Sequence, residues 1–238
     1  MIGVTEPPVY RQLSLDFGQP ASGRFEDFFV GENAQVVERL RQLPCANIPA
    51  FLVVWGGTGA GKTHLANALC DAFSVAQRRA ILIDGQQKAQ LFPAMLDGLA
   101  AVDLVVVDDL DQFAGDAVWE EALFHLYNKM VVSKASLLVT LSCPPMQAPF
   151  RLADLKSRLG ACETYRVVPL SHEDKREWMR QMARLRSFEL EAEWCDYILN
   201  RAARDPASLV QIINTLDAES LAAKRMMSLP FIKQVMKW

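Results

Sequence analysis

The sequence lacks long apolar runs, clustered cysteines and a strong excess of charge. Its longest wholly apolar stretches, such as Ala50–Trp55, fall far short of the ~20 residues that a membrane-spanning helix needs. Five scattered cysteines without a C-x-x-C pair argue against a disulfide framework or a zinc site. A net charge of −3 gives no global attraction to DNA phosphates. No basic flank leads into an apolar stretch at the N-terminus, so no signal peptide is expected. These absences indicate a cytoplasmic protein without strong direct DNA binding or a membrane anchor.

Short apolar, β-branched runs alternate with stretches of helical character in the first two thirds of the chain. This alternation is typical of a parallel sheet whose crossover helices cover both faces. We therefore expect an α/β fold with a five-stranded parallel sheet. The expected strands are Phe51–Trp55, Ala80–Asp84, Leu104–Asp109, Leu137–Ser142 and Tyr165–Val168.

Three parts are expected along the chain. Residues 1–23 contain Pro7-Pro8 and a turn-prone stretch at Gly18–Gly23, which predict a flexible arm. Residues 24–169 form the α/β domain. Residues 170–238 show no strand pattern and predict a small all-helical domain. Its expected helices run from a capping box at Ser171 and Asp174 to about Phe188, over Glu191–Arg204, from the Asp205-Pro206 cap to about Met226, and from Pro230 onward.

The octapeptide GGTGAGKT at Gly56–Thr63 fits the phosphate-loop pattern G-x-x-x-x-G-K-[ST]. It follows an expected strand and precedes an expected helix over His64–Phe73, which is the context that the motif requires. Its backbone N–H groups can surround phosphate oxygens, Lys62 can meet the β- and γ-phosphates, and the Thr63 hydroxyl can bind Mg²⁺. The alternative is an ordinary glycine-rich turn that binds no phosphate. The pattern predicts ADP or ATP with Mg²⁺, held by Gly56, Gly57, Thr58, Gly59, Ala60, Gly61, Lys62, Thr63 and His64.

A second motif, LVVVDDLDQF at Leu104–Phe113, ends an apolar strand in two carboxylates. Carboxylates at the C-terminal end of a strand near a phosphate loop are placed to support Mg²⁺ and to polarise an attacking water. We assign the first role to Asp108 and the second to Asp109. A solvated turn after the strand is the alternative.

Other features are ambiguous from the residues alone. The hexapeptide QLSLDF at Gln12–Phe17 could be an edge strand or an extended peptide that docks into a partner's groove. Arg158, taken by itself, would be an ordinary surface arginine. The three histidines share no metal-ligand spacing.

The motifs together resemble a known family. GGTGAGKTHL, LVVVDDLDQFAG, WEEALFHLYNKM and the segment RFEDFFVGENAQVVERL are similar to the DnaA branch of the AAA+ ATPases over nearly all of residues 24–226. Within that branch the chain resembles the Hda group of regulatory proteins. QLSLDF is similar to the hexapeptide that binds the DNA polymerase sliding clamp, and the chain ends at Trp238, just after the helical lid, where DnaA continues into a DNA-binding domain. The ending SLPFIKQVMKW is also similar to that group.

The resemblance implies a regulator rather than an initiator. Proteins of the Hda group hold ADP, bind the clamp on DNA and make DnaA hydrolyse its ATP. Carried over by residue, Thr63 and Asp108 support the metal, Asp109 is catalytic and Arg158 matches the arginine finger. The clamp-binding residues would be Gln12, Leu13, Leu15 and Phe17.

Two positions depart from the family pattern. The sensor-1 segment, usually acidic in the DnaA branch, reads LLVTLSCPP and leaves Thr140 and Ser142 as polar candidates. The sensor-2 arginine position falls near Ala207, with only Arg204 nearby. Without a cation aimed at the γ-phosphate, transition-state stabilisation falls. We expect nucleotide to be held well and intrinsic hydrolysis to be weak.

Whether the chain is itself an enzyme stays open at this stage. The alternative is a self-contained, clamp-tethered AAA+ ATPase or helicase loader that turns over ATP through Lys62, Asp108 and Asp109. Expected partners are DnaA and the sliding clamp, and assembly with further copies of this chain stays open. The expected location is the bacterial cytoplasm, close to the nucleoid through the clamp.

Overall fold

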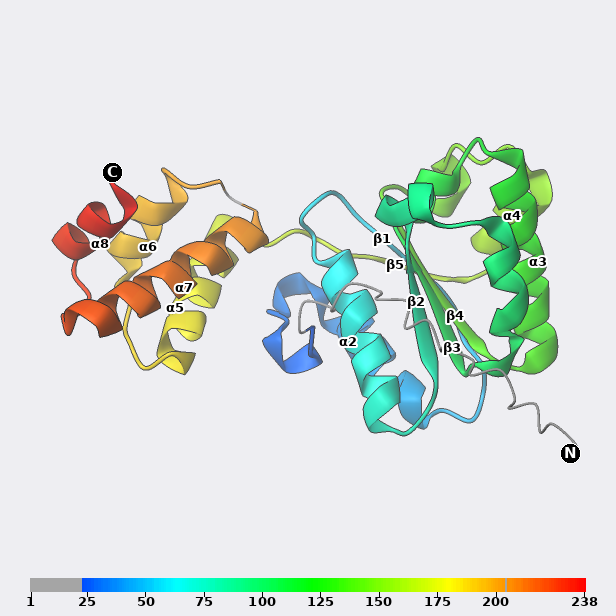
Figure 1. Cartoon of the computed structure of the whole chain (residues 1–238), viewed down its shortest axis with the longest axis horizontal. Coiled ribbons are helices and arrows are strands. Elements are labelled where there is room, and N and C mark those ends of the chain that lie inside the picture. The colour runs from blue at the N-terminus through cyan, green and yellow to red at the C-terminus, as the bar shows by residue number, and fades with distance from the viewer. Residues whose placement is uncertain (1–22, 204) are drawn as a thin grey trace, which may run out of the picture.

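The computed structural model describes residues 23–203 and 205–238. The expected clamp-binding residues Gln12, Leu13, Leu15 and Phe17, and the sensor candidate Arg204, lie outside the described residues. A larger α/β part and a smaller helical part are joined by the chain around Val167–Leu170 (Figure 1). None of the helices in the described ranges combines the length and apolarity needed to cross a bilayer.

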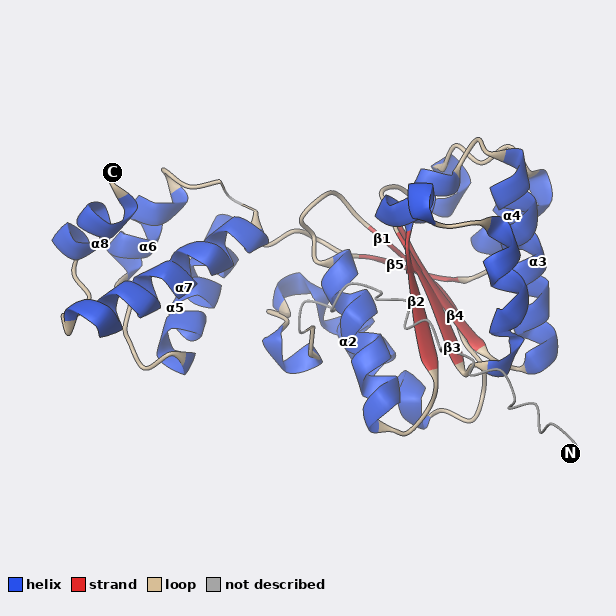
Figure 2. Cartoon of the chain, in the orientation of Figure 1, coloured by secondary structure: helices blue, strands red, loops and turns tan. Residues whose placement is uncertain are grey.

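A five-stranded parallel sheet forms the centre of the α/β part (Figure 2). The strand order is β2-β3-β4-β1-β5, and every neighbouring pair runs parallel. This architecture confirms the expected fold class. The strands are β1 (Phe51–Trp55), β2 (Ala80–Asp84), β3 (Leu104–Asp108), β4 (Ser136–Leu141) and β5 (Glu163–Arg166).

Helices cover both faces of the sheet, as the apolar runs predict. On one face, α1 (Ala34–Gln42) and α2 (Lys62–Val75) share an apolar layer with alternate residues of β1, β3 and β4. On the other face, α3 (Ala117–Ser133) and α4 (Ala153–Gly160) enclose a second layer. Short 3₁₀ segments lie at Phe25–Asp27, Gly31–Asn33, Leu43–Cys45, Gly85–Gln90, Pro93–Ala101, Leu110–Phe113 and Pro145–Gln147.

The fifth strand differs from the expectation. An apolar run at Tyr165–Val168 was expected to form it, whereas β5 begins at Glu163, is mostly exposed and ends at Arg166. The reason is its position at the sheet edge, where pairing with β1 through Leu52 and Glu163 sets the register and one side needs no apolar cover. The apolar signal came from Val167, which is buried just beyond the strand.

Four helices form the helical part, with their own apolar core. They are α5 (His172–Leu185), α6 (Ala192–Leu199), α7 (Pro206–Ala223) and α8 (Leu229–Met236). Both α6 and α7 end before the expected boundaries. Leu199 closes α6, and the following residues connect it to Asp205, the N-cap of α7. Lys224 adopts left-handed backbone angles and so terminates α7.

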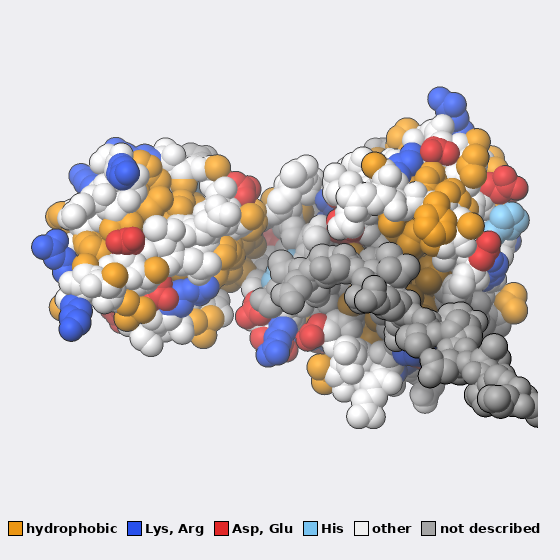
Figure 3. Space-filling model, viewed as in Figure 1, with side chains coloured by type: hydrophobic (Ala, Val, Ile, Leu, Met, Phe, Trp, Pro, Cys, Tyr) orange, Lys and Arg blue, Asp and Glu red, His pale blue; other side chains and the backbone are white. Residues whose placement is uncertain are grey.

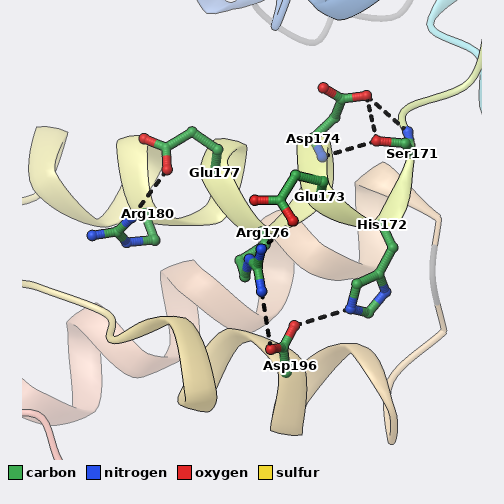
Figure 4. Close-up of polar contacts among 8 residues, drawn as sticks. All are labelled: Ser171, His172, Glu173, Asp174, Arg176, Glu177, Arg180 and Asp196. Carbon is green, nitrogen blue, oxygen red and sulfur yellow. Dashed lines mark hydrogen bonds and ion pairs between the residues drawn. The ribbon is translucent and has the colours of Figure 1, made fainter.

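Polar contacts fix the start of α5 and its packing on α6 (Figure 4). The Ser171 hydroxyl accepts the Asp174 N–H, and the Asp174 carboxylate accepts the Ser171 N–H, which confirms the predicted capping box. The Asp196 carboxylate on α6 lies 2.9 Å from His172 Nε2 and accepts from Arg176. Histidine and arginine of one helix thus meet one carboxylate of the next.

The N-terminal described segment connects both parts. The Asn33 side chain is buried and makes two hydrogen bonds with the Val168 backbone, donating to its carbonyl at 3.0 Å and accepting its N–H at 2.8 Å. Phe29, a few residues earlier, packs against the apolar core of the helical part. This segment therefore holds the link between the two parts in place.

The surface shown in Figure 3 carries charges of both signs. Lys and Arg side chains lie dispersed among acidic, apolar and other groups, and the described part of that face has no continuous basic patch. This distribution agrees with the modest net charge of −3.

Candidate nucleotide site

The loop Gly56–Gly61 connects β1 to α2 and makes a tight turn at the end of the sheet. Gly59 and Gly61 have φ angles of 74° and 98°, which favour glycine. A Cβ at Gly61 would lie 2.7 Å from the Phe28 ring, so that position also requires a close approach. The turn leaves the N–H groups in the first turn of α2 without carbonyl partners inside the helix. Such N–H groups and the helix dipole favour an anion at this end.

Lys62 is the cation of the loop. Its side chain is 8% exposed, and its Nζ donates to the Gly56 carbonyl at 2.9 Å and to that of Gly57 at 3.4 Å. Within the described ranges, no carboxylate lies at ion-pair distance from this amine. A buried ammonium group without a carboxylate is costly unless an anion compensates it. The residues present therefore fit a bound phosphate group.

Asp108 and Thr140 form a buried pair at the ends of β3 and β4. Asp108 is 2% exposed, and Thr140 is fully buried. The Thr140 hydroxyl donates to Asp108 Oδ1 at 2.5 Å and accepts the Asp109 N–H at 2.8 Å. Burial raises the pKa of Asp108, while hydrogen bonds from Thr140 and Thr63 oppose that rise. Thr140, one of the two sensor-1 candidates, thus contacts the carboxylate directly.

The same contacts test the expected metal site. Thr63 is the second residue of α2, and its hydroxyl lies close enough to the Asp108 carboxylate to oppose the rise in the pKa of that group. A hydroxyl and a carboxylate oxygen beside a phosphate cradle are the ligands that Mg²⁺ takes in such sites, with water and phosphate completing the shell. In the described part of the chain, no cluster of three or more His, Cys, Asp and Glu side chains suggests a metal held by protein alone. The residue set fits Mg²⁺ bound together with a nucleotide.

Asp109 lies in a strained turn directly after β3. Its φ of 48° is left-handed, which aspartate tolerates better than most residues. Gln86 Nε2 donates to Asp109 Oδ2 at 2.7 Å and so orients the carboxylate. Gly85 allows the close approach, since a Cβ there would lie 2.4 Å from the Asp109 carbonyl oxygen. Sequence reasoning missed Gln86 and Gly85, because only the pairing of β2 with β3 places them beside Asp109.

The remaining predicted residues of the loop region have separate roles in the structure. His64 Nε2 lies 2.9 Å from the Arg24 carbonyl oxygen, so this side chain connects α2 to the N-terminal described segment. Ala60 is buried and donates its N–H to the Gly57 carbonyl. Ser142 is exposed, and its backbone N–H donates to Asp111 Oδ2 at 2.7 Å. The structure thus brings Thr140 to the carboxylates, while Ser142 contacts Asp111 through its backbone.

The helical part approaches the phosphate loop at the start of α7. A Cβ at Gly59 would lie 3.5 Å from Pro206 Cδ. Asp205 caps the helix by accepting the Ser208 N–H, as its sequence predicts. Ala207, in the same first turn, is exposed and uncharged. The first turn of α7, whose Pro206 lies beside the loop, therefore carries the uncharged Ala207 near the expected sensor-2 position.

Arg158 lies elsewhere. It is exposed on α4, on the sheet face opposite α2, and its guanidinium carbon is 5.6 Å from the centre of the Tyr127 ring. Its guanidinium group lies over the Tyr127 ring, and its backbone carbonyl accepts from Cys162 Sγ and from the Ala161 N–H. The structure does not bring Arg158 to the phosphate loop of its own chain.

Sequence comparison shows the family to which the chain belongs. A sequence model of the bacterial DnaA ATPase domain matches residues 21–164, and one of the Hda lid domain matches residues 172–236. The chain belongs to the DnaA ATPase family. Its α/β part is a DnaA-type AAA+ module, and its helical part is an Hda-type lid.

Several solved structures share the fold of this chain. Domain III of the replication initiation protein DnaA from Thermotoga maritima has a TM-score of 0.74 at 20% identity, and the match covers 91% of this chain and 96% of that domain. AMPPCP-bound DnaA from Aquifex aeolicus has a TM-score of 0.71 at 20% identity, covering 85% and 66%. The Holliday junction motor RuvB from Thermotoga maritima is more distant, with a TM-score of 0.64 at 15% identity, covering 86% and 68%.

Proposed function

We propose that this DnaA-related protein binds ADP with Mg²⁺ and promotes hydrolysis of the ATP held by DnaA, thereby restraining the initiation of DNA replication. The observation that carries the proposal is the position of Arg158. It is exposed on α4 and contacts nothing of its own phosphate loop in the described part of the chain. An arginine so placed can serve the nucleotide of a neighbouring molecule. Arginine fingers supplied in this way raise phosphoryl-transfer rates by about 10³–10⁵.

The chain's own nucleotide has a structural role in this proposal. Lys62 would hold the β-phosphate, Thr63 and Asp108 would hold Mg²⁺, and the first turn of α7 would close over the loop from the lid. Bound nucleotide supplies negative charge that compensates the buried Lys62. The uncharged Ala207 in that turn supports weak intrinsic hydrolysis, because no cation from this position reaches a developing γ-phosphate charge.

Clamp binding by QLSLDF completes the proposal. Gln12, Leu13, Leu15 and Phe17 would dock in a pocket of the sliding clamp as an extended peptide. The clamp would then bring this chain and DnaA to the same DNA and turn a weak encounter into an effectively intramolecular one. This activity belongs in the bacterial cytoplasm, near the nucleoid. In this proposal the chain consists of an arm over residues 1–23, an AAA+ module over 24–169 and a lid over 170–238. The protein can also assemble with further copies of itself.

Substitution of Arg158 tests the central claim. Arg158→Ala should lower the stimulated hydrolysis of DnaA-bound ATP at least about a hundredfold, measured with the full chain and clamp loaded on DNA. Arg158→Lys should restore little, because an ammonium on a flexible stem does not reproduce the planar guanidinium. ADP affinity should stay within about twofold of wild type in calorimetry, since Arg158 is remote from the phosphate loop.

Arg166 offers a matched control. It is also exposed and also stacks on an aromatic ring, with its guanidinium carbon 5.4 Å from the centre of Trp55. Arg166→Ala should leave stimulated hydrolysis near wild type. Equal activity of wild type and Arg158→Ala would refute the trans-acting finger. Loss of ADP binding in Arg158→Ala would show instead that Arg158 serves its own site.

A self-contained ATPase is the alternative, and one observation favours it. Asp108, Asp109, Thr140 and Gln86 are assembled at the strand ends as a hydrolytic site would need them. Turnover of ATP by the purified chain alone, abolished by Asp109→Asn, would support this alternative. Negligible turnover alone, together with strong stimulation of DnaA, would support the regulator.

A further inference from the structure

Helices α3 and α4 lie on one face of the sheet and form the surroundings of Arg158, the proposed arginine finger. Helix α4 carries Arg158 and lies beside α3 (Figure 1). The Arg158 guanidinium carbon is 5.6 Å from the centre of the Tyr127 ring, which projects from α3. This distance is within the ~6 Å at which a guanidinium is attracted to an aromatic face. The side chain that would reach DnaA thus rests on a ring from the neighbouring helix.

The Tyr127 ring is itself firmly held. Tyr127 is 9% exposed and belongs to the apolar layer on this face of the sheet. Its ring centre lies 4.9 Å from that of Phe51 on β1. The Tyr127 hydroxyl interacts with Cys162, which follows α4, and burial raises the pKa of that hydroxyl. A ring packed against a strand within this buried layer offers Arg158 a platform with little freedom of its own.

The same face of α3 also fixes the backbone at the start of α4. Glu120 lies seven residues, or two turns, before Tyr127 and so on the same side of the helix. It is 1% exposed, and its Oε2 accepts the N–H groups of Arg151 at 2.9 Å and Leu152 at 2.6 Å. Its Oε1 accepts the Gly115 N–H at 2.6 Å. The backbone leading into α4 is therefore held against α3. The Arg158 side chain is not fixed by these contacts, and its orientation depends on its own surroundings.

We infer that Tyr127 is a positioning residue for Arg158, holding its guanidinium by ring stacking in the orientation that reaches the partner's nucleotide. The inference rests on the proposed function of Arg158. An exposed arginine samples many rotamers, and fixing one of them at the transition state, where the γ-phosphate charge develops, costs conformational entropy. Stacking on a buried ring removes part of that freedom before the partner arrives. Tyr127 then acts on the rate of the stimulated step and leaves the affinity for the partner unchanged.

A pair of substitutions separates ring stacking from other roles. Tyr127→Phe keeps the ring and removes the hydroxyl, whereas Tyr127→Leu removes the ring. With clamp-loaded full chain and ATP-bound DnaA, Tyr127→Leu should lower the maximal stimulated rate roughly twofold to fivefold, the range of an exposed cation–π contact. The concentration giving half-maximal stimulation should stay unchanged. Tyr127→Phe should retain the wild-type rate.

Phe113→Leu is the matched control, because it removes a ring from the same apolar layer, and that ring packs against Trp119 rather than against Tyr127. It should leave the maximal rate unchanged. In the Arg158→Ala background, Tyr127→Leu should cause no further loss, as expected for residues that act as one unit. ADP affinity and the melting temperature report whether each variant is folded. If Tyr127→Leu fails these checks, Tyr127→Met, which is also ringless but fills more of the space, replaces it.

The outcomes separate this inference from the function on which it rests. If Arg158→Ala keeps full stimulation, the proposed function itself fails. If Arg158→Ala is inactive while Tyr127→Leu keeps the wild-type maximal rate, only the role of Tyr127 is overturned. A change in half-maximal concentration alone would make Tyr127 an interface contact instead. Equal losses in the Phe and Leu variants would assign the effect to the hydroxyl and refute ring stacking.

Discussion

Replacing Thr140 with valine removes a single hydroxyl from the buried junction of β3 and β4. Val has nearly the shape of Thr but cannot form either of its hydrogen bonds. One is donated to the Asp108 carboxylate at 2.5 Å and the other is accepted from the Asp109 N–H at 2.8 Å. A hydrogen bond to a charged group contributes about 1.5–3 kcal/mol and a neutral one about 1 kcal/mol. Thr140→Val should therefore lower the free energy of unfolding by roughly 2.5–4 kcal/mol at neutral pH.

The pH dependence of this loss has a definite sign. Burial raises the pKa of Asp108 above its value in the unfolded chain, so the folded state binds the proton more readily. The contribution of Asp108 to stability therefore decreases as pH rises from its unfolded pKa through its folded pKa. The hydrogen bond from Thr140 opposes the rise in the pKa of Asp108. Loss of this bond therefore makes the decrease in stability between acid and neutral pH larger. The destabilisation by Thr140→Val should consequently be larger at neutral pH than below the unfolded pKa, at about pH 3.

Urea denaturation at the two pH values measures both effects. Thr140→Ser is the control, because it keeps the hydroxyl, and it should retain most of the stability that Thr140→Val loses. Equal stability of the Ser and Val variants would refute the reasoning, since the methyl group and not the hydroxyl would then matter. A destabilisation by Thr140→Val that grows toward acid pH would contradict a hydrogen bond from Thr140 to an ionised Asp108.

Three further predictions concern the loop, the carboxylate turn and the arm. Lys62→Ala should weaken ADP binding at least tenfold, ~1.4 kcal/mol, in calorimetry, and unchanged affinity would remove the basis for the phosphate site. Gly85→Ala should lower the melting temperature, because its Cβ would lie 2.4 Å from the Asp109 carbonyl oxygen; a wild-type melting curve would show that this turn relaxes freely. Replacing Leu15 and Phe17 with alanine should abolish clamp binding and leave the melting temperature almost unchanged, whereas a fall of several degrees would indicate an edge strand.

Local sequence patterns determined much of this protein. The apolar runs specified β1 to β4. The three central strands, β1, β3 and β4, are buried, and strands buried on both faces need continuous apolar residues. The Gly56–Thr63 motif specified a strand–loop–helix unit because its glycines, lysine and threonine each meet a separate local requirement. The caps at Ser171 and Asp205 were readable for the same reason: a helix start depends on a few neighbouring residues.

Features that depend on contacts between distant segments were decided only by the tertiary structure. The strand order and the exposed edge position of β5 follow from pairing across the sheet. Gln86 meets Asp109, and Tyr127 meets Arg158, only because the fold brings separate elements together. Neither Gln86 nor Tyr127 carries a local signal of its partner. A short motif encodes its own backbone, whereas the orientation of a side chain by a remote residue depends on the packing of the whole domain.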